Sequence, residues 1–179
     1  MKAYLTKSPV IETERLTLRA PRIGDYPAWE AFYASDRAAF IGGPGGPGPA
    51  WRALCHAAGM WVFLGFGSFV FCRRDDETPL GMTGPWYPAD WPERELGWTV
   101  WAAEVEGTGL AFEAACAARD YAFGTLNWST AVSYIDPANA RSVALAKRMG
   151  ATLDYDAARP LSDGKPAPLV YRHPRPEGL

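Results

Sequence analysis

The chain has 179 residues, 48% of them hydrophobic, and a formal net charge of -2 with a sequence pI of about 5.7. This length suits one well-buried core, and we expect a single domain over residues 1–179 with a flexible N-terminus over residues 1–9. An acidic chain without a long basic run is not expected to bind nucleic acid. It also lacks the apolar core of a signal peptide and any stretch of about 18 apolar residues, which predicts a cytoplasmic protein without a membrane span.

The cysteine and histidine pattern argues against a metal site and against a disulfide framework. Cys55, Cys72 and Cys116 are widely separated and form no Cys-x-x-Cys pair, and the only histidines are His56 and His173. Adjacent Cys55 and His56 suggest a nucleophile, but neighbours on a helix point about 100° apart. We expect both to be packing or surface residues.

The first part of the chain predicts one strand and two helices. Residues 11–19 alternate as a strand does, and Gly24-Asp25 can cap a helix that continues through residues 29–33. The run GGPGGPGP at residues 42–49 predicts a loop that is mobile in its glycine parts. It is either a lid over a cleft or a spacer before a second helix, which we expect from Pro49 to about Gly59.

The middle of the chain predicts an antiparallel meander followed by a helix. Strands are expected at residues 68–73, 80–86 and 95–101, with a charged hairpin turn between the first two. Alanines at helical spacing predict a helix that begins at Thr108, ends near Gly124 and has a small-residue face.

The last part predicts a strand at residues 129–135 and a helix from Pro137 to Met149 that ends at Gly150. Two further strands are expected at residues 153–155 and 169–171. The predicted order is therefore β-α-α-β-β-β-α-β-α-β-β. The Pro- and Gly-containing segment 159–168 either closes the functional site or contacts a second subunit.

The turn at residues 106–111 is a candidate anion site. A β-branched and aromatic run ends in Gly107-Thr108-Gly109, which opens the alanine-rich helix. A helix N-terminus has unpaired N-H groups and the positive end of the dipole, and glycines allow a phosphate to approach them. A plain tight turn is the alternative. The two common nucleotide fingerprints are absent, since no Walker motif is present and Phe112 replaces the third glycine of Gly-x-Gly-x-x-Gly.

This glycine turn, followed after the next strand by Asn139-x-x-Ser142, resembles the GNAT superfamily of acyl-CoA-dependent N-acetyltransferases. The opening at residues 14–19 (ERLTLR) is similar to the branch of ribosomal-protein N-terminal acetyltransferases. The resemblance covers nearly the whole chain. It implies an α/β fold with a mixed, mainly antiparallel twisted sheet and helices on both faces.

The resemblance also implies that acetyl-CoA is the cofactor and that no metal is needed. The residues it assigns to cofactor binding are Val100, Trp101, Glu106, Gly107, Thr108, Gly109, Leu110, Ala111, Asn139 and Ser142. Glu106 departs from the family pattern, which has Arg or Gln there. A carboxylate beside a pyrophosphate is repelled unless it points to solvent or pairs with a cation.

Two of these assignments concern main-chain and capping groups. In this family the acyl-pantetheine arm inserts between two splayed strands, where Val100 and Trp101 would offer backbone groups. Alternatively, Trp101 is only a core aromatic. Asn139 and Ser142 share a helix face toward the acyl-CoA, although Asn139 can equally be a plain helix cap.

The family's usual acid, a tyrosine seven residues after the asparagine, is replaced here by Ala146. Ser142 is therefore the candidate donor of a hydrogen bond to the CoA sulfur. An amine acceptor must lose a proton, and Glu95, on the strand that enters the splay, is the leading candidate base. Asp90 and Glu93 are the alternatives, and each acid can also be an ordinary surface residue.

The acceptor side is predicted to be rich in aromatic residues. Those expected to border it are Trp51, Trp61, Trp86, Tyr87 and Trp91, which could also be core residues. A small amine, an amino acid and a protein N-terminus all remain possible acceptors, and the chain is expected to be a monomer or a homodimer. The retained Gly107, Gly109, Asn139 and Ser142 favour an acetyl-CoA-dependent N-acetyltransferase that transfers an acetyl group to a primary amine by direct attack in a ternary complex. The competing hypothesis is a non-catalytic acyl-CoA-binding or protein-interaction module, which Glu106 and Ala146 favour.

Overall fold

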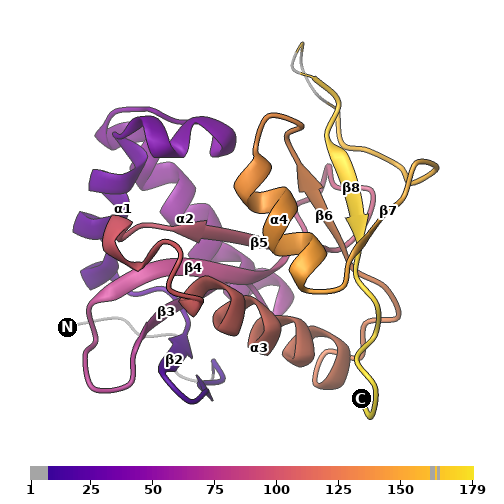
Figure 1. Cartoon of the computed structure of the whole chain (residues 1–179). Coiled ribbons are helices and arrows are strands. Elements are labelled where there is room, and N and C mark those ends of the chain that lie inside the picture. Colours follow the sequence, from indigo (N-terminus) through magenta and orange to yellow (C-terminus); the bar gives the residue numbers. More distant parts are fainter. Residues whose placement is uncertain (1–7, 162–163, 165) are drawn as a thin grey trace.

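The computed structural model describes residues 8–161, 164 and 166–179, and so most of the terminus expected to be flexible lies outside the described residues. Figure 1 shows a sheet with helices packed against it. The strands are β1 (Ile11–Glu12), β2 (Leu16–Arg19), β3 (Phe69–Arg73), β4 (Pro79–Trp86), β5 (Glu95–Val100), β6 (Val132–Ile135), β7 (Thr152–Leu153) and β8 (Leu169–Arg172). The α-helices are α1 (Tyr26–Tyr33), α2 (Pro47–Leu64), α3 (Leu110–Gly124) and α4 (Ala140–Arg148), and the 3-10 turns are η1 (Ile23–Asp25), η2 (Asp36–Ile41) and η3 (Ala103–Val105).

The eight strands form one sheet in the order β1-β2-β3-β4-β5-β6-β8-β7. All neighbours are antiparallel except β5 and β6, which are parallel and pair at a single position, Glu95 opposite Val132. Beyond that pair the two strands share no ladder, whereas β4 and β5 pair over six positions. The sheet is therefore split between β5 and β6, as the resemblance predicts.

Alternating side chains of β3 place helices on both faces of the sheet. Phe69 and Phe71 pack in a core with Leu110 and Ala114 of α3. Val70 and Cys72 face the opposite way and pack with residues of α1 and α2 such as Trp29, Phe32, Ala50 and Leu54. The small residues of α3 predicted to face the sheet are buried, and they allow close packing.

The single strand expected at residues 11–19 is wrong, because β1 and β2 are separate and pair with each other. A tight turn reverses the chain between them. The Thr13 hydroxyl oxygen accepts from the Leu16 N-H at 3.0 Å, and the Thr13 N-H donates to the Leu16 carbonyl at 2.9 Å. A threonine side chain that satisfies a nearby backbone group commonly makes such a turn.

The glycine and proline segment is shorter and better anchored than expected. Helix α2 begins at Pro47 and continues to Leu64, so part of this segment forms its first turn. The remaining residues are held by α1, since the Tyr33 hydroxyl donates to the Gly42 carbonyl at 3.1 Å and the Gly45 N-H donates to the Tyr33 carbonyl at 3.0 Å. A Cβ at Gly43 would lie 2.6 Å from the Ala38 Cβ. These contacts tie the segment to α1, and its role as a lid or as a spacer stays a prediction.

Helix α4 begins at Ala140, and not at Pro137 as expected. The Asp136 carboxylate accepts from the Ala138 N-H at 2.8 Å, which forms a turn before the helix. Asn139 is then the N-cap. Strand β6 begins at Val132, three residues later than the expected 129. Within the described ranges, no helix is long and apolar enough to cross a membrane.

Candidate active site

A cavity of about 520 Å³ opens at the split between β5 and β6. One wall comes from α1, η2 and α2, and the other comes from β5, β6 and the start of α4. Its lining contains the aromatic residues Trp29, Phe40, His56, Trp86, Trp91, Trp98 and Tyr134 and the polar residues Ser68, Glu95, Thr99, Ser133, Asp136, Asn139 and Ser142. The predicted residues Glu95, Asn139 and Ser142 are thus brought to one cavity.

Glu95 lies at the one position where β5 and β6 still pair. Burial raises the pKa of its carboxyl to about 7, against hydrogen bonds that lower it. Those bonds come from the Trp91 indole N-H and from the backbone N-H of Tyr134 at 3.3 Å. A carboxyl group in a cavity with a pKa near neutrality can accept a proton and release it again at physiological pH.

The two alternative acids are placed less favourably. Asp90 is exposed in the loop before β5 and does not line the cavity. Both oxygens of Glu93 accept from the Arg172 guanidinium, at 2.8 and 2.9 Å. Glu93 is thus engaged through both oxygens in a bidentate ion pair, and it does not line the cavity.

Asn139 and Ser142 connect the start of α4 to β5. The Asn139 side chain accepts from the Ser142 N-H at 3.1 Å, so Asn139 is a helix cap that also lines the cavity. The Ser142 oxygen accepts from the Trp98 indole N-H at 3.1 Å. Because an indole nitrogen only donates, the Ser142 hydroxyl proton stays available for another acceptor. Ala146, within α4, is fully buried and packs with Ile135 and Tyr171.

A second hydrogen-bonded group, formed by Ser133, Leu96 and His173, spans the split. Leu96 and His173 lie 37 and 40 residues from Ser133, so no local sequence pattern indicates this group. The Ser133 hydroxyl of β6 donates to the Leu96 carbonyl of β5 and also contacts His173 Nε2 at 2.9 Å. The donor there is the Nε2 proton, since Ser133 has already used its own. Burial lowers the pKa of His173 to about 4, so the ring is neutral. This link joins two strands that have lost their ladder.

The predicted anion site at the start of α3 has the geometry it needs. Gly107 and Gly109 have φ angles of +76° and +84°, and a Cβ at Gly107 would meet nothing within 4 Å. No side chain caps the helix. A smaller cavity of about 440 Å³ beside this turn is lined by residues that include Thr108, Gly109, Arg15 and Arg148. The same lining contains the acids Glu14 and Glu113, and Glu113 is paired with Arg15 at 2.6 Å, so the helix N-H groups and Arg148 are the groups that fit a pyrophosphate or phosphate group.

The other side chains of this turn offer few groups to a ligand. Leu110 is 1% exposed and belongs to the core, so its contribution to a ligand is limited to the main chain. Ala111 is half-buried in the first turn of α3. The Thr108 hydroxyl donates to the Val105 carbonyl at 2.6 Å, which fixes the turn. The expected ligand contacts therefore come from backbone N-H groups.

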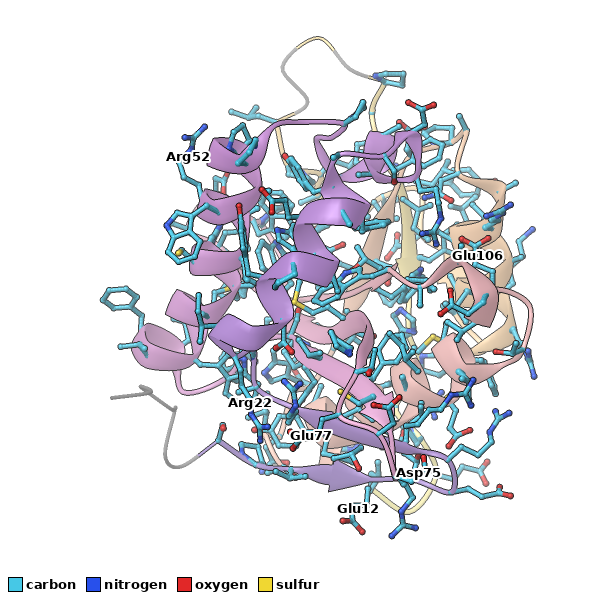
Figure 2. The ribbon with its side chains drawn as sticks, turned by 90° about the vertical axis from the view of Figure 1, so that its left-hand side faces the viewer. Glu12, Arg22, Arg52, Asp75, Glu77 and Glu106 are labelled. Carbon is cyan, nitrogen blue, oxygen red and sulfur yellow. The ribbon has the colours of Figure 1, made fainter. Side chains whose placement is uncertain are left out.

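Glu106 is paired with two cations, as the repulsion argument requires. Its carboxylate accepts from Arg37 of η2 and from Arg141 of α4. Figure 2 shows Glu106 on the side of the molecule opposite to Arg52 of α2. The pairing joins segments that lie 69 and 35 residues from Glu106 in the sequence. The negative charge is therefore balanced beside the expected pyrophosphate site.

The main-chain groups of Val100 and Trp101 are already engaged within the chain. Arg37 donates to the Val100 carbonyl at 2.9 Å and to the Trp101 carbonyl at 2.6 Å, and the Trp101 N-H donates to the Leu80 carbonyl at 2.8 Å. Trp101 itself is 5% exposed, so its side chain is core. A ligand would have to use the second lone pair of these carbonyls or displace Arg37.

Of the five aromatic residues expected at the acceptor side, Trp86 and Trp91 line the cavity. Trp61 does not, because it is buried in the core and donates to the Ser68 carbonyl at 3.0 Å. Trp51 is 45% exposed and packs edge-on against Tyr26. Tyr87 is half-buried and is not part of the lining.

Cys55 and His56 are both exposed on α2, and only His56 lines the cavity, with its ring centroid 4.8 Å from that of Trp86. No hydrogen bond between Cys55 and His56 is found in the described part of the chain, so nothing supports the hypothesis that this pair forms a nucleophile. The described residues also contain no group of three or more His, Cys, Asp or Glu residues that could hold a metal ion.

Comparisons with a family model and with solved structures point to the same family. Residues 15–152 match the model of the acetyltransferase (GNAT) domain. The structure is similar to an acetyltransferase from Agrobacterium tumefaciens strain C58, with 41% identity and a TM-score of 0.85, over 93% of this chain and 95% of that one. No curated protein sequence matches the chain.

Two more distant structures share the fold. A ribosomal-protein-S5-alanine acetyltransferase from Vibrio fischeri is 15% identical with a TM-score of 0.71, over 96% of this chain and 99% of that one. A ribosomal L7/L12 α-N-protein acetyltransferase solved with coenzyme A is 16% identical with a TM-score of 0.72, over 93% and 98%. The suspected branch is therefore represented among the structural neighbours.

Proposed function

The chain belongs to the GNAT acetyltransferase family, and from this premise we propose that it transfers the acetyl group of acetyl-CoA to the nitrogen of a primary amine. The observation that carries the proposal is the position of Glu95. It faces a cavity at the split of the sheet with a pKa of about 7, in the same cavity as Ser142. Direct attack by an amine needs such a proton acceptor beside the acetyl group.

Cofactor binding is assigned to the turn at the start of α3 and to the start of α4. Acetyl-CoA supplies an acetyl group activated as a thioester. The N-H groups at Gly109, Leu110 and Ala111 would hold its pyrophosphate, because no side chain caps this helix. Arg148, which lines the cavity beside the same turn, adds positive charge, whereas Arg15 is paired with Glu113. Glu106 is compatible with this site because two arginines balance its charge.

Glu95 acts as the general base in this proposal. The amine arrives as a cation at neutral pH, and a carboxylate in the cavity attracts it and then removes a proton, directly or through water. A Glu95 with a pKa near 7 is half ionised at pH 7, so both protonation states are accessible during turnover.

Ser142 has a different role in the same cavity. Its oxygen is fixed by the Trp98 indole, which orients the free hydroxyl proton. A hydroxyl is too weak an acid for full proton transfer at neutral pH, and so Ser142 donates a hydrogen bond to the leaving sulfur. Asn139 fixes the helix turn from which Ser142 projects.

The proposal is tested by incubating the protein with acetyl-CoA and a panel of primary amines, following thiol release and identifying the product by mass spectrometry. The expected product is an N-acetylated amine. Acetyl-CoA binding with no acetylated product from any amine, amino acid or peptide would favour the non-catalytic module instead. An O-acetylated product alone would contradict the assignment of a nitrogen acceptor.

A further inference from the structure

The charges around the cavity restrict the acceptor. Among the described residues that line it, two are acidic, Glu95 and Asp136, and none is a lysine or an arginine. Arg37 belongs to the η2 segment that also supplies part of the wall, but its guanidinium is held by Glu106 and two backbone carbonyls. A carboxylate buried without a cation carries a large desolvation cost. A substrate with a carboxylate beside its amine is therefore disfavoured here.

The polar side chains of the cavity are also largely paired with each other or with the main chain. Ser133 bonds Leu96 and His173, and Ser68 donates to the Pro85 carbonyl at 3.2 Å. The Thr99 hydroxyl accepts from the Trp101 indole at 2.9 Å. A peptide would bring several amide groups into this space, and buried amides need partners. A ligand with one polar group, the amine, avoids that requirement.

The walls suit an apolar body. Trp86, Trp91 and Trp98 contribute ring surfaces, and Phe40 is 48% exposed, whereas Trp29 is 3% exposed and mainly belongs to the core. Aromatic faces bind alkyl and aryl groups and also attract an ammonium ion. The volume of about 520 Å³ must also contain the acetyl group, which limits the acceptor to a small molecule.

Resting on the proposed acetyl transfer, we infer that the acceptor is a small primary amine with an apolar alkyl or aryl body and without a carboxylate. The amine lies toward Glu95, and the apolar body lies between the tryptophans and the rim of the cavity. Amino acids and protein N-termini are the acceptors that this arrangement selects against.

A matched substrate series tests the inference. We would compare 2-phenylethylamine with L-phenylalanine, which adds only the carboxylate, and with a short peptide that has a free N-terminal alanine. The kcat/KM for 2-phenylethylamine should exceed both by about 100-fold, because an unpaired carboxylate or unpaired amides lose affinity steeply. A higher kcat/KM for phenylalanine or the peptide would overturn the acceptor class and leave acetyl transfer intact. If no acceptor of any class is acetylated, the proposed function fails, and this inference with it.

A variant pair then tests the role of charge directly. His56→Arg places a cation in the cavity, whereas Cys55→Arg adds the same cation on the same helix outside it, and both positions are exposed. In His56→Arg, the ratio of kcat/KM for 2-phenylethylamine to kcat/KM for phenylalanine should fall about tenfold, because the introduced cation hydrogen-bonds the carboxylate of phenylalanine. Cys55→Arg should leave the ratio unchanged. Equal ratios in both variants would contradict the charge argument.

Discussion

The two halves of the site are built in opposite ways. The start of α3 is a main-chain site with open glycines and arginines around it, whereas the cavity at the split is walled by aromatic side chains around one carboxyl group. The first depends on a few consecutive residues, and the second on residues from seven elements, which are α1, η2, α2, β4, β5, β6 and α4. Consequently, changes of backbone conformation should impair the start of α3, and changes of charge and hydrogen bonding should impair the cavity at the split.

The largest effect is expected from Gly109→Val. Its φ of +84° is strained for a β-branched side chain. We expect kcat/KM for acetyl-CoA to fall by roughly 100-fold or more, because the helix N-H groups lose their alignment. Gly65→Val is the control, since Gly65 also has a positive φ, at the end of α2. Equal losses in both variants would indicate general destabilisation instead.

A comparable loss confined to turnover is expected from Glu95→Gln. The amide keeps the size of the side chain but cannot accept a proton, so kcat should fall about 100-fold while the affinity for acetyl-CoA stays the same. Asp90→Asn, at an exposed acid outside the cavity, provides the comparison. An unchanged kcat in Glu95→Gln removes this residue from the mechanism.

A smaller effect is expected in the pH dependence of kcat/KM. Because the base acts when deprotonated, kcat/KM should rise through about pH 7 and then level off. The Trp91 hydrogen bond lowers this pKa, so Trp91→Phe should move the rising limb to higher pH, by about one unit. A limb that moves to lower pH or stays in place would show that another group sets the profile.

The same raised pKa has a stability consequence with a defined sign. Between about pH 4.5 and 7, Glu95 is protonated in the folded chain and ionised in the unfolded chain. This group therefore contributes less to stability as pH rises through that window. Glu95→Gln should reduce the loss of stability between pH 5 and 8, as measured by denaturant titration at each pH.

The smallest effect is expected from Glu106→Gln. Removing the carboxylate frees Arg37 and Arg141 beside the expected pyrophosphate, so the affinity for acetyl-CoA should rise by about three- to tenfold. The increase should shrink at high salt. Glu104→Gln, a neighbouring exposed acid, should change little. Weaker binding by Glu106→Gln would mean that the ion pairs mainly hold Arg37 in place.

Much of the fold follows from local sequence. The alanine spacing of α3, the glycine turn before it and the three-strand meander were predicted close to their observed bounds. Two of the errors occurred where a side chain redirects the chain locally. Thr13 closes the turn between β1 and β2, and Asp136 delays the start of α4. Such hydrogen bonds compete with hydrophobic periodicity and are not evident from it.

The candidate site was harder to predict from the sequence than the fold was. Glu95 could be selected by its place on a strand, but its raised pKa depends on burial that only the folded chain provides. The partners of Glu106 lie in two distant segments, and the link from Ser133 to His173 spans 40 residues. Pairings of this kind arise from tertiary packing, so a single sequence gives little indication of them.

The most direct test of the account is a calorimetric titration of acetyl-CoA into the wild-type protein and into Gly109→Val, with CoA and ATP as comparison ligands. The account predicts saturable 1:1 binding of acetyl-CoA and CoA to the wild type, weaker binding of ATP, and loss of acetyl-CoA binding in the variant. Undiminished acetyl-CoA binding by a folded Gly109→Val protein would contradict the assignment of the helix start as the pyrophosphate site.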